Sequence, residues 1–240
     1  MIESVNNEKI KIYAKLNDKK YRQQTNLFLI PGEHLVNEAI KKNLIKEIFL
    51  LKGENNPYGD VTYVNDKVLK KLSTLNTPPK VIAVCHKPNN HQIKGNIIMI
   101  DDLIDPGNLG TIIRSAVAFN YETIIISPKA VDIYNPKVIK ATEGMFFHIN
   151  FIINDLKPMI KELKEKDYLI IGSDVKNGKQ PNKLNQKHVI IIGNEAQGIN
   201  QGLSGLIDYN LHIKMSPLCE SLNASVSASI LMYELNKGDY

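Results

Sequence analysis

The sequence has 240 residues, of which 43% are hydrophobic and 23% charged, and its formal net charge is +5. This composition predicts one large or two modest globular domains and excludes extended disorder. No apolar stretch reaches the roughly 18 residues of a transmembrane helix, and the N-terminus lacks the apolar core of a signal peptide. The two cysteines, far apart and without CxxC spacing, support neither a disulfide framework nor a zinc finger. We therefore expect a cytosolic, cytoplasmic protein.

The positive charge is unevenly distributed along the chain. Residues 1–95 hold 16 Lys and Arg against 9 Asp and Glu, whereas residues 96–240 hold 14 against 16. The first region is therefore a candidate surface for a polyanion, although a solvated lysine-rich surface explains the same count. Only Arg22 and Arg114 are arginines, which suggests that a planar five-donor fork is needed where they stand.

In chain order, residues 27–50 are the first segment with clear periodicity. They predict a short strand, a Pro-Gly turn, a helix and a second strand. Residues 66–74 predict a helix, and residues 78–87 predict a strand after a Pro-Pro breaker. The polar segment 86–95 contains Pro and Gly and is typical of a connection between domains. We expect a small α/β domain over residues 1–95.

Beyond residue 95, short apolar runs alternate with helical patterns. Runs of this kind with helices between them are typical of a mostly parallel sheet that is covered on both faces. A second α/β domain is therefore expected over residues 96–240. Its predicted strands are 96–101, 123–128, 168–173 and 188–193, and its predicted helices begin near 108, at 154 and near 221.

Three segments of the second domain carry candidate functional residues, and the first is Asp101–Arg114. Asn108 is placed to cap the helix that begins there. Arg114 lies roughly 140° from Leu109 around that helix and so leaves its apolar face. The functional interpretation points Arg114 into a cleft at the carboxyl end of the strand, where α/β sheets bind ligands. The alternative is a capped helix with a solvent-exposed arginine.

The second segment runs from a buried strand into a glycine-containing loop. Gly193 and Gly198 permit close approach of the backbone to a ligand, with Glu195 between them. The alternative is an ordinary turn.

The third segment, residues 213–227, predicts a strand, a Pro-containing loop and a run of small polar residues that enters an apolar helix. Its hydroxyl and amide groups would line a concave site. Ser221 or Asn223 would equally serve as a helix cap, and the two roles are compatible.

Several familiar motifs are absent from the sequence. It contains no GxGxxG after the first strand of the second domain, no GxxxxGK[ST], no HExxH and no GxSxG. This weakens dinucleotide, nucleoside triphosphate, zinc-protease and serine-hydrolase interpretations. The six histidines form no metal-like cluster, so no metal is expected.

The three segments, in this order and spacing, resemble the signature motifs of the SpoU (TrmH-like) RNA ribose methyltransferases of the SPOUT superfamily. The first domain is similar to the small substrate-binding module of that family. The residues that carry the resemblance are Asn108, Gly110 and Arg114; Gly193, Glu195 and Gly198; Ile213, Met215, Glu220, Ser221, Leu222 and Asn223; and, in the first domain, Tyr21, Arg22, Phe28, Gly32 and Glu33.

The resemblance implies methyl transfer from S-adenosyl-L-methionine (SAM) to a ribose 2′-hydroxyl of RNA. It also implies a C-terminal trefoil knot, where periodicity alone predicts an unknotted sheet, and a homodimer whose site is completed across the interface. The residues implied for SAM binding are Gly193, Gly198, Ile213, Met215 and Leu222. Those implied around the transferred methyl group are Asn108, Arg114, Glu195, Ser221 and Asn223, with Arg114 in the catalytic role.

Free arginine has a pKa above about 12 and is a poor base. We therefore expect Arg114 to orient the hydroxyl or a neighbouring phosphate, with Glu195 as the alternative base. The sequence departs from the family pattern at Lys214 and Pro217, where Pro and Gly are usual, and at 140–144, which replaces an Arg-Ala-Ser-x-Gly segment. The loop 214–219 is thus expected to bend differently around the cofactor.

Ribosomal RNA is the expected substrate, because the small N-terminal module is typical of that branch. A transfer-RNA enzyme and a methyltransferase of ribosome-directed antibiotic resistance are alternatives within the class. The alternative from another class is a noncatalytic RNA-binding or assembly protein with the same fold.

Overall fold

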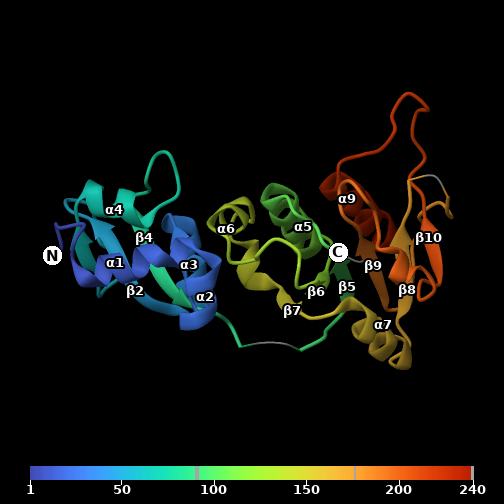
Figure 1. Ribbon diagram of the computed structural model, residues 1–240, viewed down its shortest axis with the longest axis horizontal. Helices are drawn as coiled ribbons and strands as arrows, with labels where there is room; N and C mark the ends of the chain where they lie inside the picture. Colours follow the sequence, from blue (N-terminus) through green and yellow to red (C-terminus); the bar gives the residue numbers. More distant parts are fainter. Residues whose placement is uncertain (90–91, 176, 239–240) are drawn as a thin grey trace. The chain divides into compact units, whose positions relative to one another are not determined.

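The computed structural model describes residues 1–89, 92–175 and 177–238, and the chain divides into two compact units (Figure 1). The N-terminal unit comprises residues 1–89 together with 132–147, and the C-terminal unit comprises 90–131 and 148–240. The segment 132–147 therefore leaves the second half of the sequence and folds with the first. The division at residue 95, drawn from sequence, stays a prediction.

The N-terminal unit is built on a four-stranded sheet in the order β1-β4-β2-β3. Strand β4 lies antiparallel to β1 and β2, and β3 lies parallel to β2. One face packs Ile10, Val68 and Leu69 from helices α1 and α4 against strand residues such as Phe49. The elements are α1 (Glu8–Ala14), η1 (Lys15–Asn17), α2 (Lys19–Thr25), β1 (Leu27–Pro31), α3 (Glu33–Lys41), β2 (Ile45–Leu51), β3 (Thr62–Val64), α4 (Asp66–Leu72) and β4 (Val81–His86).

The segment 132–147 adds helix α6 (Pro136–Ala141) and most of the 3₁₀ turn η2 (Met145–His148) to this unit. The Phe28 ring on β1 lies 5.0 Å from the ring of Tyr134 and 5.7 Å from that of Phe146, measured between centroids. Arg22 on α2 forms an ion pair of 2.6 Å with Asp132. The sequence predicted that the planar guanidinium is needed where arginine occurs. At Arg22 the guanidinium forms a buried ion pair, which agrees with that prediction.

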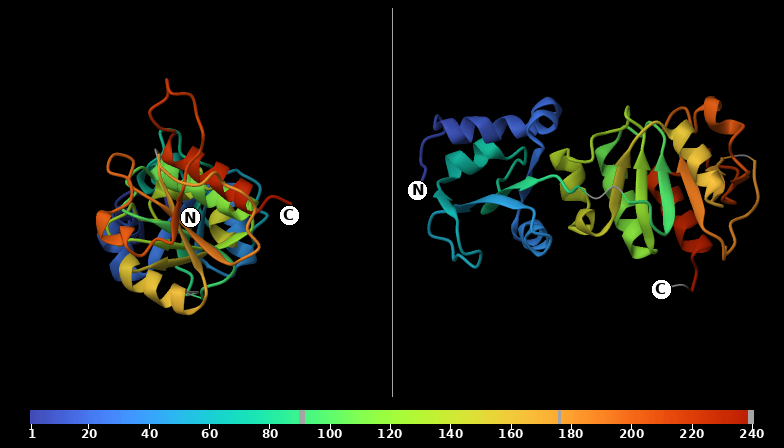
Figure 2. Two further views of the ribbon diagram at one scale, coloured as in Figure 1. Left: turned by 90° about the vertical axis from the view of Figure 1, so that its right-hand side faces the viewer. Right: turned by 90° about the horizontal axis from the view of Figure 1, so that it is seen from below.

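The C-terminal unit contains a six-stranded sheet in the order β10-β8-β9-β5-β6-β7, and all its strand pairs are parallel. Helices α7 and α8 pack on one face, and α5 and α9 pack together on the other (Figure 2). The predicted parallel α/β sheet is confirmed, and the trefoil knot stays a prediction. The elements are β5 (Asn96–Ile100), α5 (Pro106–Ala118), β6 (Tyr121–Ile126), β7 (Asn150–Ile153), α7 (Leu156–Glu165), β8 (Leu169–Ser173), β9 (His188–Ile192), α8 (Gln201–Ser204), β10 (Tyr209–Leu211) and α9 (Ala224–Leu235). Across the residues described, no helix is long and apolar enough to cross a bilayer.

The start of α5 differs from the sequence prediction, which made Asn108 the helix cap. The cap is Asp105, whose Oδ1 accepts a hydrogen bond from the backbone N–H of Asn108 at 2.7 Å. Pro106 occupies the first helical position, where its fixed φ favours the helix and its missing N–H costs nothing. Asn108 therefore lies within the first turn, and its side chain is free for other contacts.

The strand predicted to run into Ile213 is also shorter than expected. Strand β10 ends at Leu211, and residues 212–223 form an irregular segment. Helix α9 begins at Ala224, where the Asn223 side chain accepts hydrogen bonds from the backbone N–H groups of Ser225 and Val226.

Candidate active site

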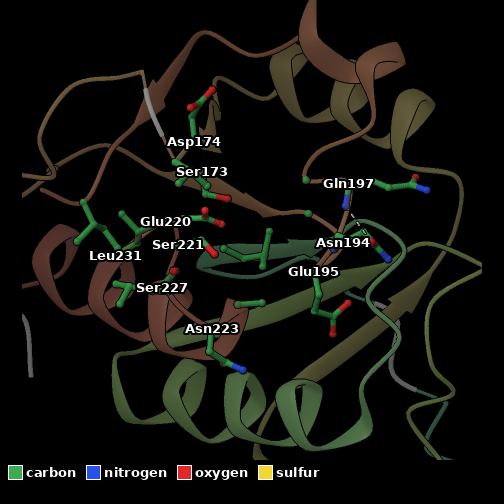
Figure 3. A pocket seen from close by; sticks show the side chains of 18 of the residues that line it. Ser173, Asp174, Asn194, Glu195, Gln197, Glu220, Ser221, Asn223, Ser227 and Leu231 are labelled. Carbon is green, nitrogen blue, oxygen red and sulfur yellow. Dashed lines mark hydrogen bonds between the residues drawn. The ribbon is translucent and has the colours of Figure 1, made fainter. Parts of the chain in front are cut away.

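A cavity of about 970 Å³ lies at the carboxyl ends of β8 and β9 in the C-terminal unit (Figure 3). Its wall comes from the end of β8, from the loop after β9 and from the segment between β10 and α9. The carboxyl ends of parallel strands meet at one edge of a sheet, which is where such folds bind ligands. Eight of the ten predicted site residues line it: Gly193, Glu195, Gly198, Ile213, Met215, Ser221, Leu222 and Asn223.

Asn108 joins two parts of this wall through hydrogen bonds. Its Nδ2 donates to Glu195 Oε1 at 3.1 Å, and its Oδ1 accepts from Asn223 Nδ2 at 2.9 Å. The Asn223 Oδ1 meanwhile caps α9, so both roles expected for Asn223 are combined in one side chain. One hydrogen-bonded chain thus connects the three sequence segments.

Glu195 is held as an ionised acceptor. Burial raises the pKa of Glu195, but hydrogen bonds from the Asn108 side chain and from backbone N–H groups, including those of Asp105 and Ile104, outweigh burial and place the pKa below its ordinary value. The two backbone bonds measure 3.1 Å and 3.3 Å. A carboxylate with a lowered pKa is a weak general base, because its affinity for a proton is small. The geometry favours Glu195 as a positioning and charge-bearing group.

The loop 193–198 is folded tightly upon itself. The backbone groups of Asn194 and Gly198 exchange two hydrogen bonds, of 3.0 Å and 2.9 Å. A Cβ atom added at Gly193 would collide with the backbone of Gly198 and Ile199. Glycine is therefore needed at position 193 because the loop's own backbone passes close to it, before any ligand is considered. Asn194 ties the loop to the end of β5 through a 2.8 Å bond to the Asp102 carbonyl.

Arg114 occupies a different place from the other predicted residues. It follows Asn108 by six residues on α5, which puts the two side chains about 120° apart around the helix axis. The Arg114 side chain is exposed and does not belong to the cavity wall. Within one chain, the cavity is formed without Arg114.

Sequence reasoning missed part of the wall. Ser173 ends β8 and Asp174 and Val175 follow it, and their signal was their position at the carboxyl end of a predicted strand. Glu220 and Ser227 belong to the segment 213–227 that was expected to line a concave site, but they were not among the predicted site residues, and Leu231, farther along α9, was missed.

The charge of the wall indicates the class of ligand. Asp174, Glu195 and Glu220 place three carboxyl groups around the cavity (Figure 3), and its described lining contains no Lys, Arg or His. A wall of this sign suits a cation and disfavours a phosphate-bearing nucleotide. The remaining wall is largely backbone and apolar side chains, including Ile192, Leu211, Ile213, Leu222 and Leu231. A ligand with a flat apolar part and a positive charge, such as SAM, fits these residues.

Comparison with known proteins identifies the family. Residues 95–233 match the model of the SpoU rRNA Methylase family, and residues 7–83 match the MRM3-like substrate binding domain. A Bacillus subtilis protein named 23S rRNA (guanosine(2553)-2′-O)-methyltransferase RlmP is 35% identical, over 98% of this chain and 98% of its own.

Solved structures share the fold over nearly the whole chain. One described as an RNA 2′-O ribose methyltransferase has 26% identity and a TM-score of 0.82, and the match covers 97% of this chain and 96% of that one. An AdoMet-bound rRNA methyltransferase from Sinorhizobium meliloti, at 23% identity, has a TM-score of 0.84 over 97% and 95% of the two chains, which shows the shared fold. The family predicted from the three motifs is confirmed: this chain belongs to the SpoU rRNA Methylase family.

Proposed function

We propose that this protein transfers the methyl group of SAM to a ribose 2′-hydroxyl of 23S rRNA. The observation that carries the proposal is the acidic and apolar cavity lined by the second and third motif segments, to which Asn108 of the first segment is joined by hydrogen bonds with Glu195 and Asn223. The B. subtilis relative, similar over almost the entire chain, supports 23S rRNA as the substrate. On this proposal the protein works in the cytoplasm, where ribosomal RNA is found.

On this proposal, particular residues of the cavity wall hold particular parts of the cofactor. The apolar side chains of Ile213 and Leu222 would pack on the adenine, and backbone groups between Gly193 and Gly198 would bond its polar edge. The nearby carboxylates would balance the sulfonium and ammonium charges. When bound, SAM supplies a methyl group activated by the positive sulfur.

The remaining task of the protein is to place the 2′-oxygen in line with that methyl group and to accommodate the hydroxyl proton. The Nδ2 and Oδ1 atoms of the Asn108 side-chain amide are engaged by Glu195 and Asn223, so Asn108 is a positioning residue that holds these two wall residues together. Arg114 would orient the ribose hydroxyl or the adjoining phosphate, which suits its planar fork of donors.

We infer that Arg114 acts on the cavity of a second copy of the chain. Arg114 leaves the wall of its own cavity, while the neighbouring helix α9 exposes Val226 and Tyr233. Helices α5 and α9 pack together, with the Ser115 and Ser229 hydroxyls 2.7 Å apart. Exposed apolar side chains beside Arg114 on this packed helix pair suit a homodimer in which each chain completes the other's site.

The test combines cofactor binding with mapping of the modified ribose. Calorimetry should detect saturable SAM binding, and methyl transfer should occur to 23S rRNA from cells that lack this protein but not to tRNA. Ribose-methylation mapping of RNA from cells with and without the protein should then differ at a single nucleotide of 23S rRNA. Saturable SAM binding with no transfer to any RNA would favour the noncatalytic alternative, and transfer to tRNA alone would reassign the substrate.

A further inference from the structure

A groove of about 430 Å³ runs between helices α1 and α4 of the N-terminal unit, where the two helices lie side by side (Figure 1). Four of its six lining residues are lysines. The lining consists of Val5, Asn6, Lys11, Lys67, Lys70 and Lys71. We call this feature the lysine groove.

The amphipathic pattern of α4 explains why the lysines point outward. Val68, Leu69 and Leu72 are buried against the sheet. Lys67, Lys70 and Lys71 are spaced i, i+3 and i+4, which places them on one exposed face opposite the buried side chains. The groove is therefore a fixed feature of the packed helix pair.

The charge of the lysine groove is poorly compensated. Lys11 bonds Glu8 at 3.1 Å, but the Glu8 side chain is 84% exposed, so the pair is strongly solvated. In the described part of the chain, no ion pair is recorded for Lys67, Lys70 or Lys71. Lys70 and Lys71 follow Lys67 by three and four residues, so their side chains neighbour that of Lys67 on the helix surface, where like charges are unfavourable.

A purely structural role explains only part of this arrangement. Lys70 and Lys71 lie in the last turn of α4, where cations interact favourably with the helix dipole. Lys67 lies in the first turn, just after the cap Asn65 and Asp66, where a cation is disfavoured. Helix stability therefore gives no reason for Lys67.

We propose that the lysine groove binds the phosphate backbone of the RNA substrate. The inference rests on the proposed function, and it assigns the contact to the α1–α4 side of the N-terminal unit. The groove lining offers no aromatic ring on which a base could stack. Lysine also approaches phosphate as a point charge and does not read a base edge as an arginine fork does. The groove thus contributes affinity and orientation, and leaves the choice of nucleotide to other surfaces.

The test compares two pairs of lysine substitutions with the same i, i+4 spacing. The double variant Lys67→Gln, Lys71→Gln alters the groove, and Lys157→Gln, Lys161→Gln alters exposed lysines of α7 in the C-terminal unit. RNA affinity is measured at several KCl concentrations, together with SAM affinity and kcat at saturating RNA.

For the groove variant, the Kd for RNA should rise on the order of tenfold near 0.1 M salt. The slope of log K against log salt should become shallower by about 1 to 2, since about 0.7 to 0.9 is lost per phosphate contact. Its SAM affinity, its kcat, the nucleotide methylated and its melting temperature should match wild type. The α7 variant should match wild type in every measurement.

An unchanged salt slope in the groove variant, or an equal loss of RNA affinity in both variants, would overturn the assignment. A fall in melting temperature that accompanies the loss of RNA affinity would also overturn it, in favour of a structural role. These results are distinct from failure of the proposed function, which would appear as absence of methyl transfer by the wild-type protein.

Discussion

Among single residues, Arg22 shows most clearly why one side chain type is needed. Its Nε and Nη2 donate to Asp132 Oδ2 at 3.0 Å and 2.6 Å, and its Nη1 donates to the Leu16 carbonyl at 2.7 Å. The residue is 2% exposed. A lysine carries the same charge but cannot reproduce this divergent set of bonds. The guanidinium thus links α2 to the segment 132–147, which is 110 residues away in sequence.

Arg22→Lys should therefore destabilise the protein by about 2 kcal/mol or more, because it leaves a buried carboxylate and a carbonyl incompletely bonded. Thermal unfolding followed by circular dichroism would measure the loss. Lys20→Gln, an exposed change on the same helix, is the matched control and should shift the midpoint very little. Equal midpoints for the two variants would show that the ion pair contributes little.

The lowered pKa of Glu195 leads to a prediction about pH dependence. Its pKa in the folded protein is lowered, so its stabilising bonds are fully present above the unfolded pKa of about 4.3 and are lost as pH falls through the lower, folded value. Across pH 6 to 8 the group stays ionised. When kcat is measured against pH, we expect no decrease toward low pH in this range that is due to protonation of Glu195.

Glu195→Gln removes the charge and turns an amide donor toward a backbone N–H. SAM affinity should weaken on the order of tenfold, while kcat at saturating substrates should fall by less than the 10² to 10⁴ typical of a lost general base. Glu162→Gln on the exposed side of α7 is the control. A wild-type acid limb that disappears in Glu195→Gln would instead make Glu195 the base.

A helix or strand was predictable from sequence where its own residues carry the pattern that stabilises it. The buried strands of the C-terminal sheet, such as β5 and β9, appear as continuous apolar runs, so their parallel arrangement was predictable. Strands β7 and β10 have four and three residues, and helix α1 has seven. Such short elements are stabilised by their neighbours and show little periodicity of their own.

Contacts across long sequence separations were outside the reach of local patterns. The segment 132–147 is placed by contacts with Arg22 and Phe28 of the N-terminal unit. The pattern of the roughly 16 residues of the segment itself does not indicate these distant partners. The convergence of the three motif segments was predictable, because strand ends share an edge. The surroundings of Arg114 were not, since its angle from the apolar face of α5 does not specify which surface the side chain reaches.

The N-terminal cap of helix α5 leads to a further prediction. Its cap Asp105 fixes the first turn, and that turn carries Asn108 to Glu195. Asp105→Ala should cost about 1 kcal/mol of stability and should also lower kcat, because Asn108 loses its fixed position. Asp105→Asn retains a capping oxygen and should restore both the melting temperature and the turnover. A kcat that remains low in Asp105→Asn would mean that the charge of Asp105, and not its cap, supports catalysis.

In the whole molecule, the two units carry different surface features. The C-terminal unit provides the acidic cavity, and the N-terminal unit holds the lysine excess and the lysine groove. The chain passes between the units after residues 89, 131 and 147. Because the segment 132–147 connects β6 to β7 of the C-terminal sheet yet folds with the N-terminal unit, the two units cannot be separated by a single cut without breaking one of them.

Assembly of two chains gives the last prediction. Arg114→Lys and Arg114→Ala should both lose most of kcat with RNA and SAM affinities nearly intact, since neither change touches the cavity wall. Leu222→Lys should abolish SAM binding by placing a long side chain in the wall, with Arg114 left in place. Each variant alone should be inactive.

If Arg114 serves the partner's cavity, a mixed dimer of Arg114→Ala with Leu222→Lys contains one complete site, made from an intact cavity of the first chain and an intact arginine of the second. Co-expression with two different tags and random pairing should then restore about a quarter of wild-type activity, because about half of the dimers are mixed and each has one working site of two. Dimers purified through both tags should reach about half. Complete inactivity of doubly tagged, correctly folded dimers would require Arg114 to act within its own chain, and a monomeric mass in light scattering would exclude the shared site.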